Sequence, residues 1–302
     1  MKIVNIIGGL GNQMFQYAFA IALQEKFRDE KVLIDTTHFN YLFIKKLGAA
    51  NLHNGFEIEK IFPKANLKHA TARDLMKITW YMPNYVLSRV IRRIFPIRKN
   101  EYIQNSTGIF AYNDDIFNVK GNGYFEGVWQ SIRYFEAVRD KLQAIFSHPE
   151  PNDYNRKMIR NILDDNSVGI HVRRGDYLSL PAFCGICGVE YYKKGIDEVL
   201  KDGKEYTFYI FSNDMKWCEN HIAPLVGSNK IEYVSGNIGE NSCWDMFLMT
   251  YCKDLIIANS SFSWWGAFLS KSVNRVIAPY PWLNRDCIME NYMDGWIKIK
   301  SN

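Results

Sequence analysis

The chain has 302 residues, enough for one large domain or two ordinary ones, and its 47% hydrophobic and 23% charged residues are usual for a globular protein. This balance excludes a disordered chain and a fibrous protein. The excess of 37 Lys and Arg over 32 Asp and Glu gives a net charge of +5, which favours small anionic ligands; without a long basic run it does not indicate nucleic acid.

The N-terminal residues predict a β-loop-α-β opening: a strand over Lys2–Ile7, a tight loop over Gly8–Asn12, a helix over Met14–Phe27 and a strand over Lys31–Ile34. The apolar start superficially resembles a secretory signal, but glycines break it early, and no stretch of about 18 apolar residues occurs. We therefore expect a soluble, cytoplasmic protein with its 6 cysteines as reduced thiols.

The glycine-rich loop has two interpretations. Gly9-x-Gly11 matches half of a dinucleotide fingerprint, but Met14 occupies the third glycine position, which argues against an NAD-dependent oxidoreductase. Its backbone N–H groups precede a helix start that favours negative charge, and the Asn12 amide can donate a hydrogen bond to a phosphate-bearing ligand. In the other interpretation, the loop only connects the strand to the helix.

The segment Leu75–Ile97 mixes aromatic and apolar residues with arginines, so a helix there would be amphipathic and basic. That pattern suits peripheral attachment to the inner face of an anionic membrane. Packing against the rest of the protein explains it too, because Pro83 and Pro96 interrupt or end the helix. Farther on, Gly121–Gln130 contains a short strand with Glu126, and Tyr134–Phe146 has a helical pattern.

His148–Asp153, with two prolines in a polar cluster, is the best linker candidate, and we predict an N-terminal domain over residues 1–152 and a C-terminal one over 153–302. The second half alternates strand-like runs with helical patterns, which predicts a second parallel sheet. The runs are Val168–Val172, Tyr206–Phe211, Leu255–Ala258 and Arg275–Ala278.

Polar residues follow these strands, and the ends of neighbouring parallel strands meet at one edge of a sheet, where ligands of such folds bind. An arginine placed there offers a planar fork to phosphate oxygens. Serines at the start of a helix either cap it or, with its N–H groups, hold a diphosphate. A solvated turn with a surface ion pair, and capping alone, are the structural alternatives. The residues concerned are Arg173, Arg174, Asp176, Ser212–Asp214 and Asn259–Ser261.

The sequence contains no Asp-x-Asp pair, the usual short signal for a metal that holds a sugar nucleotide. Arginine and a helix dipole are then expected to replace metal for a departing diphosphate. Cys184, Cys187, Cys218 and His221 have the form of a four-ligand zinc site, although about thirty residues separate the two pairs. Thiols scattered through the core are the alternative.

Four segments resemble those of bacterial α-1,2-fucosyltransferases of glycosyltransferase family 11, and the likeness spans nearly the whole chain. They are Gly8–Ala20, His171–Tyr177, Phe211–Asp214 and Asn259–Leu269. The resemblance implies an α/β, GT-B-like pair of Rossmann-type domains facing a cleft, GDP-L-fucose as donor and inversion at the fucose anomeric carbon. It also implies a galactose-terminated glycan as acceptor and no required metal or other cofactor.

The resemblance also assigns site residues. It places His171 near guanine and ribose, Arg173 on the β-phosphate and Asn12 near the diphosphate or fucose. Asp245 would contact guanine. Ser260, Ser261 and Phe262 would line the diphosphate and sugar, and Arg174 and Asp214 at the same edge complete the expected donor-binding set.

The general base is left open between Asp176, which we place with Arg173 in the catalytic pair, and Glu126; the departing phosphate can itself accept the proton. A fucosyltransferase of another linkage and a non-catalytic nucleotide-sugar-binding protein are the functional alternatives.

Overall fold

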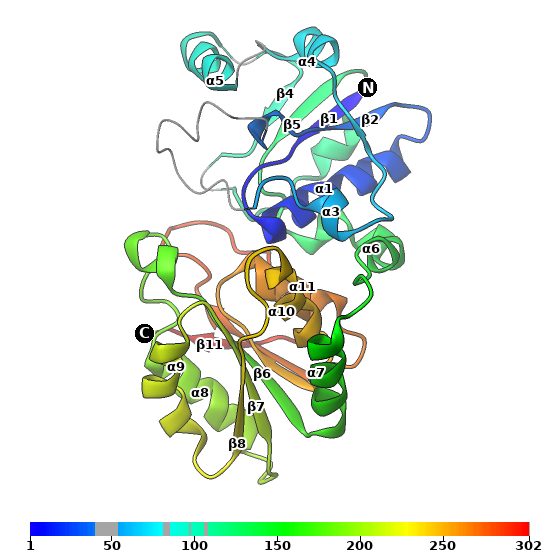
Figure 1. Ribbon diagram of the computed structural model, residues 1–302. Coiled ribbons are helices and arrows are strands. Elements are labelled where there is room, and N and C mark those ends of the chain that lie inside the picture. Colours follow the sequence, from blue (N-terminus) through cyan, green and yellow to red (C-terminus); the bar gives the residue numbers. More distant parts are fainter. Residues whose placement is uncertain (40–53, 81–84, 97, 106–107, 302) are drawn as a thin grey trace. The chain divides into compact units, whose positions relative to one another are not determined.

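A computed structural model describes residues 1–39, 54–80, 85–96, 98–105 and 108–301. The described chain forms two units, Met1–Ser147 with Cys287–Asn291, and His148–Asp286 with Tyr292–Asn302 (Figure 1). The chain passes from one unit to the other beside the predicted linker. The expected division into 1–152 and 153–302 does not include the return of Cys287–Asn291 to the first unit.

The first unit contains a parallel sheet with strand order β3-β2-β1-β5-β4. Ile3 of β1 packs with Leu75 and Ile78 of α4 on one face of the sheet, whereas α1 packs against β1 and β2. The strands are β1 (Lys2–Asn5), β2 (Val32–Asp35), β3 (Lys68–His69), β4 (Glu101–Ile103) and β5 (Gly123–Glu126), and the helices are α1 (Leu10–Lys26), α3 (Ile58–Ile61), α4 (Ala72–Ile78), α5 (Tyr85–Ile94) and α6 (Arg139–Ile145).

The β-loop-α-β opening is confirmed, but the predicted helix start at Met14 is wrong. Helix α1 begins at Leu10, because Gly9 is its N-cap and the Gly9 carbonyl accepts from the backbone N–H groups of Asn12 and Gln13, at 2.9 and 3.0 Å. Gly8 has a φ of 81°, a left-handed conformation that favours glycine. The loop before α1 is therefore shorter than predicted, and Asn12 lies in the first turn of the helix.

The long helical pattern over Leu75–Ile97 divides into two helices, α4 and α5. Helix α5 ends at Ile94, shortly before Pro96, as a proline predicts. Pro83 lies outside the described residues. The helical pattern over Tyr134–Phe146 shortens to α6, which two short 3-10 turns precede.

The second unit contains a parallel sheet with strand order β11-β10-β9-β6-β7-β8. The order reverses between β6 and β9, as in Rossmann-type domains, where ligands bind beyond the carboxyl ends of the strands at that point. The strands are β6 (Ser167–Val172), β7 (Thr207–Ser212), β8 (Lys230–Val234), β9 (Asp254–Ile256), β10 (Arg275–Tyr280) and β11 (Ile297–Lys300), and the helices are α7 (Asp153–Asp164), α8 (Val189–Leu200), α9 (Met215–His221), α10 (Cys243–Met249) and α11 (Ser261–Leu269).

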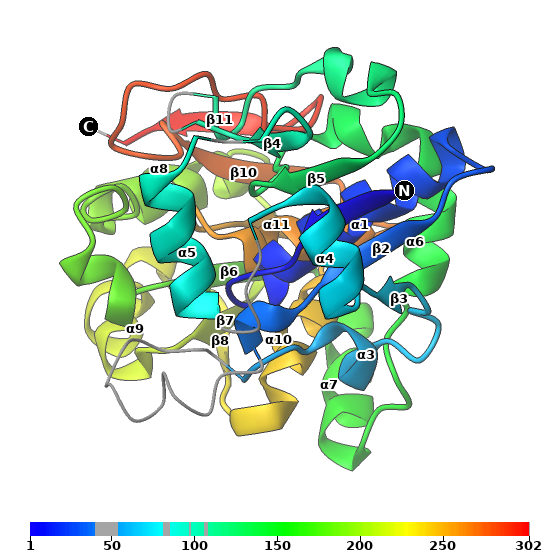
Figure 2. The same ribbon diagram turned by 90° about the horizontal axis from the view of Figure 1, so that it is seen from above.

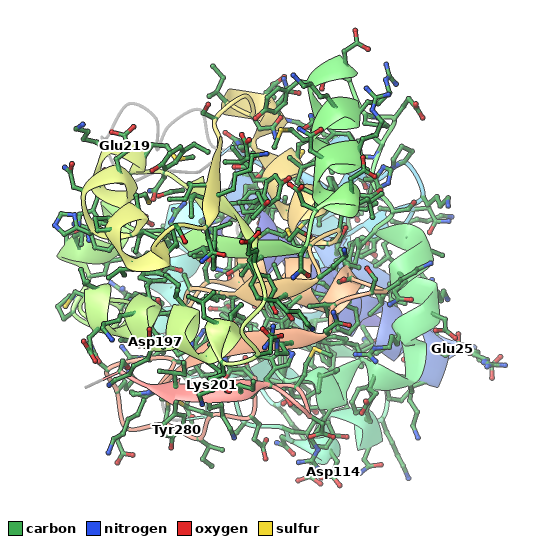
Figure 3. The ribbon with its side chains drawn as sticks, turned by 90° about the horizontal axis from the view of Figure 1, so that it is seen from below. Glu25, Asp114, Asp197, Lys201, Glu219 and Tyr280 are labelled. Carbon is green, nitrogen blue, oxygen red and sulfur yellow. The ribbon has the colours of Figure 1, made fainter. Side chains whose placement is uncertain are left out.

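Helices cover both faces of this sheet, with α8 and α9 on one side and α7, α10 and α11 on the other (Figures 1 and 2). Val168, Ile170 and Val172 of β6 join the core formed with α8 and α9. The outer side of α8 is polar, and Asp197 and Lys201 there are exposed (Figure 3). Because Val168, Ile170 and Val172 face α8 and α9, the alternate residues Gly169 and His171 lie on the opposite face of β6.

Gly169 occupies the other face of β6. A Cβ atom at this position would come within 2.8 Å of Leu255 and 3.0 Å of Cys252, both of which are buried. The strand therefore packs closely against that side of the unit. His171 follows on the same face, and Arg173 continues the alternation just beyond the end of the strand.

Candidate active site

The two arginines beyond β6 diverge because successive side chains of an extended chain point to opposite faces. Arg173 donates through Nη2 to Asp176 Oδ1 at 2.8 Å. Arg174 donates through Nε to Asp214 Oδ2 at 3.1 Å, and its guanidinium lies 4.2 Å from the centre of the Trp217 ring. The predicted pair of arginines thus forms two separate sites at the sheet edge, and only Arg173 lies on the α11 side.

Arg173 is connected to the start of α11 through Tyr177. The Tyr177 ring centre lies 5.5 Å from the Arg173 guanidinium, and the Tyr177 hydroxyl shares a hydrogen bond with Ser260. Burial raises the pKa of Tyr177 to about 12, so the phenol stays protonated at neutral pH. Ser260 is the N-cap of α11, and its Oγ accepts from the Phe262 N–H at 3.3 Å. Tyr177 thus bridges the Arg173 guanidinium and the N-cap residue of α11, Ser260.

His171 is buried beside this cluster, with its ring centroid 5.8 Å from that of Phe262. Burial, and then the charge of Arg173, lower the pKa of His171 to about 3, so the imidazole is neutral at physiological pH. Its Nδ1 atom is buried and has no hydrogen-bond partner among the described residues. Because buried polar atoms rarely lack a partner, this atom is available to a ligand.

Asp245 lies in the first turn of α10, a helix that packs against α11. Its Oδ1 accepts from Asn237 Nδ2 at 2.9 Å, and Asn237 exchanges two 3.0 Å amide hydrogen bonds with Asn155. Burial raises the pKa of Asp245 to about 7. A ligand that donates hydrogen bonds would favour the charged carboxylate and lower this pKa again.

Arg174 and Asp214 hold the ends of β6 and β7 together. Asp214 is the N-cap of α9, where its Oδ1 accepts from the Trp217 N–H at 3.1 Å, and the Arg174 N–H donates to Asn213 Oδ1 at 2.9 Å. Arg174 and Asp214 lie at the predicted sheet edge, where they contact each other, Asn213 and Trp217.

In the first unit, Asn12 lies at the point where the strand order reverses, between β1 and β5. Its Oδ1 accepts from Gln130 Nε2 at 2.8 Å, which ties the first turn of α1 to the segment after β5. Glu126 ends β5, at the same edge of that sheet. Asn12 and Glu126 thus belong to the first unit, and the Arg173 cluster belongs to the second.

An amide clamp supports the segment after β5. Gln104 Oε1 accepts from the backbone N–H groups of Val128 and Trp129 at 2.8 and 3.0 Å. Trp129 has a φ of 52°, an uncommon conformation for a bulky residue, and its ring stacks on Phe19 with centroids 4.2 Å apart. Gln104 and Gln130 were not predicted from the sequence, because a contact between distant loops leaves no spacing pattern.

The sequence-predicted residues form three groups in the second unit. His171, Arg173, Asp176, Ser260 and Phe262 form one cluster, and Ser261 opens the same helix. Arg174 with Asp214 and Asp245 with Asn237 form the other two. Tyr177 had no predicted role, although it ends the His171–Tyr177 motif and its position there was the available signal.

The four candidate zinc ligands do not assemble. Cys187 Sγ donates to Asn259 Oδ1 at 3.4 Å, Cys218 of α9 is buried in the core, and the His221 ring stacks on Trp217 at 4.8 Å. Within the described residues, no three His, Cys, Asp or Glu side chains are arranged to hold a metal ion. The alternative of separate core thiols describes Cys218, Cys243 and Cys252, which are buried.

Helix length and hydropathy also bear on membrane insertion. Over the described ranges, none of the helices combines the length and the apolar character needed to cross a bilayer.

Comparisons with known proteins find relatives among glycosyltransferases. The chain is 31% identical over 307 residues to an alpha-1,2-colitosyltransferase of Escherichia coli, a match that covers 99% of this chain and 98% of that protein. It is 23% identical over 286 residues to galactoside alpha-(1,2)-fucosyltransferase 2 of Mus musculus, covering 92% and 70% of the two chains.

The fold comparison concerns the architecture alone. The chain superposes on the alpha-1,6-fucosyltransferase NodZ of Bradyrhizobium with a TM-score of 0.50 at 13% identity, over 91% of this chain and 93% of NodZ. Together with the two parallel sheets, this likeness confirms the predicted GT-B-like pair of Rossmann-type domains. The profile of glycosyl transferase family 11 matches residues 1–300, and the chain belongs to that family.

Proposed function

We propose that the protein is an inverting α-1,2-fucosyltransferase that transfers L-fucose from GDP-L-fucose to the 2-hydroxyl of a galactose residue in an oligosaccharide or surface glycan. Family membership supports glycosyl transfer, and the mouse relative, by its name, makes this linkage on galactosides. The observation that carries the proposal is the position of Arg173 beside the N-cap of α11, at the strand reversal of a Rossmann-type sheet.

Arg173 and α11 supply the positive potential for the diphosphate. In this structure the Asp176 carboxylate occupies the Arg173 fork, and both side chains are 32% exposed. A phosphate has the same charge sign and a similar spacing of oxygens, so it can replace the carboxylate. The first N–H groups of an α-helix have no acceptor within the helix backbone, so the start of α11 favours the same anion, and Ser260 Oγ caps the Phe262 N–H there.

The nucleoside end would lie between His171 and Asp245. A neutral His171 can exchange a hydrogen bond through its buried Nδ1 with ribose or base. The Asp245 carboxylate can accept from the adjacent N1–H and 2-amino groups of guanine, a pair of donors that adenine lacks. This contact would select GDP-sugars over ADP-sugars.

The reaction is a single displacement. The acceptor 2-hydroxyl oxygen attacks the anomeric carbon of fucose from the face opposite GDP, while the carbon–oxygen bond to the β-phosphate breaks and its electron pair leaves with GDP. Arg173 stabilises the charge that develops on that phosphate. The hydroxyl proton goes to Asp176 once phosphate has displaced it from Arg173, to Glu126, or to the departing phosphate itself.

Transfer of colitose is a second candidate, because an E. coli relative that matches nearly the whole chain is an alpha-1,2-colitosyltransferase. Colitose is L-fucose without its 3-hydroxyl. An enzyme that hydrogen-bonds this hydroxyl rejects the deoxy sugar strongly, whereas an apolar contact discriminates weakly. A preference for one of the two donors therefore shows whether the sugar site hydrogen-bonds the 3-hydroxyl of L-fucose.

The test is a donor and acceptor screen with linkage analysis of the product by NMR. Incubation with GDP-L-fucose or GDP-colitose, with and without galactosides, should give GDP release that depends on acceptor and a product linked to galactose O2. Another linkage would assign a different fucosyltransferase specificity. Tight GDP binding without transfer from either donor to any acceptor would instead support a non-catalytic binding protein.

We also propose a cytoplasmic location for this activity. All six cysteines are free thiols, which suits a reducing compartment.

A further inference from the structure

The first unit exposes a set of large apolar side chains on α5 and its surroundings. Val90 is 43%, Ile94 70% and Phe95 50% exposed, and Met76 near the end of α4 is 48% exposed. Large apolar side chains are usually exposed singly on a protein surface, and a group of them marks an interaction site. These residues together with Leu87, which is 43% exposed, are called the α5 face below.

Among its described side chains, α5 exposes apolar residues that an ordinary surface helix would bury. Leu87, Val90 and Ile94 have the i, i+3, i+7 spacing of one helix face, yet all three are exposed. Ser88, a small polar residue, is only 5% exposed. The helix therefore turns an apolar face outward, although core packing would favour the opposite orientation.

Contacts around Trp80 join α5 to the end of α4. Trp80 Nε1 donates to the Pro96 carbonyl at 3.2 Å, and the Trp80 and Phe95 ring centroids are 5.5 Å apart. The Arg98 guanidinium lies 4.0 Å from the centre of the Trp80 ring. These contacts fix Phe95 beside the end of the helix and place a cation next to the aromatic pair.

The same segment contains a dense positive charge. Residues 76–99 include six basic residues and no acidic one, so the segment has a charge of +6. The whole chain has +5, so the rest of the chain has −1. The basic residues are Lys77, Arg89, Arg92, Arg93, Arg98 and Lys99.

We infer that the α5 face docks on an anionic phospholipid surface. Interfacial helices combine a large apolar face with Lys and Arg, so that apolar side chains enter the boundary between headgroups and acyl chains while the cations meet lipid phosphates. Arg93 lies beside Ile94 and is exposed, and the long arginine stem can bury its methylenes while its charge reaches the headgroups. Charge complementarity thus favours a membrane over an uncharged protein surface.

The contact would be peripheral. Helix α5 has 10 residues, which at about 1.5 Å per residue is near half the thickness of a bilayer core. The inference is independent of which sugar the enzyme transfers, and its failure would leave the proposed function untouched.

The experiment is co-sedimentation of the full chain with vesicles of phosphatidylcholine, with or without phosphatidylglycerol. We expect binding to the anionic vesicles that weakens as salt is raised, and little binding to phosphatidylcholine alone. Each cation near the surface changes partitioning about fivefold, so Arg93→Glu should lower it on the order of twentyfold. Ile94→Ser should lower it by roughly tenfold.

Matched controls are Arg28→Glu and Ile238→Ser. The Arg28 side chain is 77% and Ile238 79% exposed, so the changes in net charge and exposed apolar area are comparable, but both residues lie outside the α5 face. Thermal melting and turnover of a small water-soluble acceptor should be unchanged in all four variants, which excludes misfolding.

Absence of wild-type binding to anionic vesicles at low salt would overturn the inference, as would equal losses in the control variants. Sedimentation velocity adds a further outcome. If Ile94→Ser abolishes self-association while vesicles are ignored, the α5 face is a contact between copies of the chain and the membrane inference is wrong.

Discussion

At the scale of residues, the position of a side chain relative to the strand alternation decides its chemistry. Arg173 and Arg174 are adjacent in sequence, yet one lies with His171 on the α11 side and the other pairs with Asp214 on the α9 side. The pattern of Val168, Ile170 and Val172 predicts this division, because these side chains share one face of β6, the α8 and α9 side, and the alternate residues take the other face. The pairing of Arg174 with Asp214 could not be predicted, since Asp214 follows another strand, β7.

Asp245 gives a pH prediction. GDP binding would require the charged Asp245 carboxylate, and the pKa of this group in the free protein is about 7. Below pH 7, Asp245 must therefore lose a proton when GDP binds. GDP affinity should therefore fall as pH decreases, by roughly tenfold per unit well below the pKa. Calorimetric titrations of GDP over a pH series check this. His171, with a pKa of about 3, does not titrate in this range.

Asp245→Asn should weaken GDP binding and remove most of its dependence on pH. Without nucleotide the sign is opposite for folding: the native state holds a proton that the unfolded chain releases above an Asp pKa of 3.8, so Asp245 contributes less stability as pH rises toward 7. A GDP affinity that is flat with pH in the wild type would contradict the assignment of Asp245 to guanine.

At the scale of elements, the amide clamp after β5 can be tested. Gln104→Ala would leave the part-buried N–H groups of Val128 and Trp129 without their acceptor and should lower the free energy of unfolding by about 1 kcal/mol. Gly127→Ala should have a similar effect, because a Cβ there would lie 2.3 Å from Gln104 Oε1 and displace the amide. Urea denaturation measures both. Wild-type stability in both variants would show that the clamp is dispensable.

Among the strands, the central ones were predictable and several edge ones were not. Residues of β6, β7, β9 and β10 form nearly continuous apolar runs, because a parallel strand inside a sheet is buried on both faces. Edge strands β8 (KIEYV) and β11 (IKIK) alternate polar residues with apolar ones and are partly exposed, so their signal resembles that of a loop. The return of Cys287–Asn291 to the first unit depends on tertiary packing and leaves no periodic pattern.

At the scale of the whole molecule, the six-stranded sheet of the second unit positions the candidate donor residues around Arg173, and Asn12 lies at the strand reversal of the first unit. Family membership and both sheets were predictable because the motifs coincide with strand ends. The sugar that is transferred could not be predicted, since L-fucose and colitose differ by one hydroxyl, and no sequence motif records the contacts to it. The α5 face and the charge of residues 76–99 are likewise properties of the assembled surface.

Metal dependence is a property of the complete enzyme. We propose that Arg173 and the start of α11 replace a divalent cation, so turnover should change less than about twofold when EDTA is added and when Mg²⁺ or Mn²⁺ is supplied afterwards. Steady-state GDP release measures this. Loss of activity in EDTA with recovery in one metal would show that the diphosphate needs an ion.

The central claim is that Arg173 stabilises the departing diphosphate, and the most direct measurement compares kcat in Arg173→Ala and Arg174→Ala. Arg173→Ala should lower kcat on the order of a hundredfold or more, a loss of about 3 kcal/mol in the transition state, and keep wild-type thermal stability. Arg174→Ala should mainly lower stability, because it breaks the pair with Asp214. An Arg173→Ala enzyme that retains wild-type kcat, or an equal loss of kcat in Arg174→Ala, would contradict the claim.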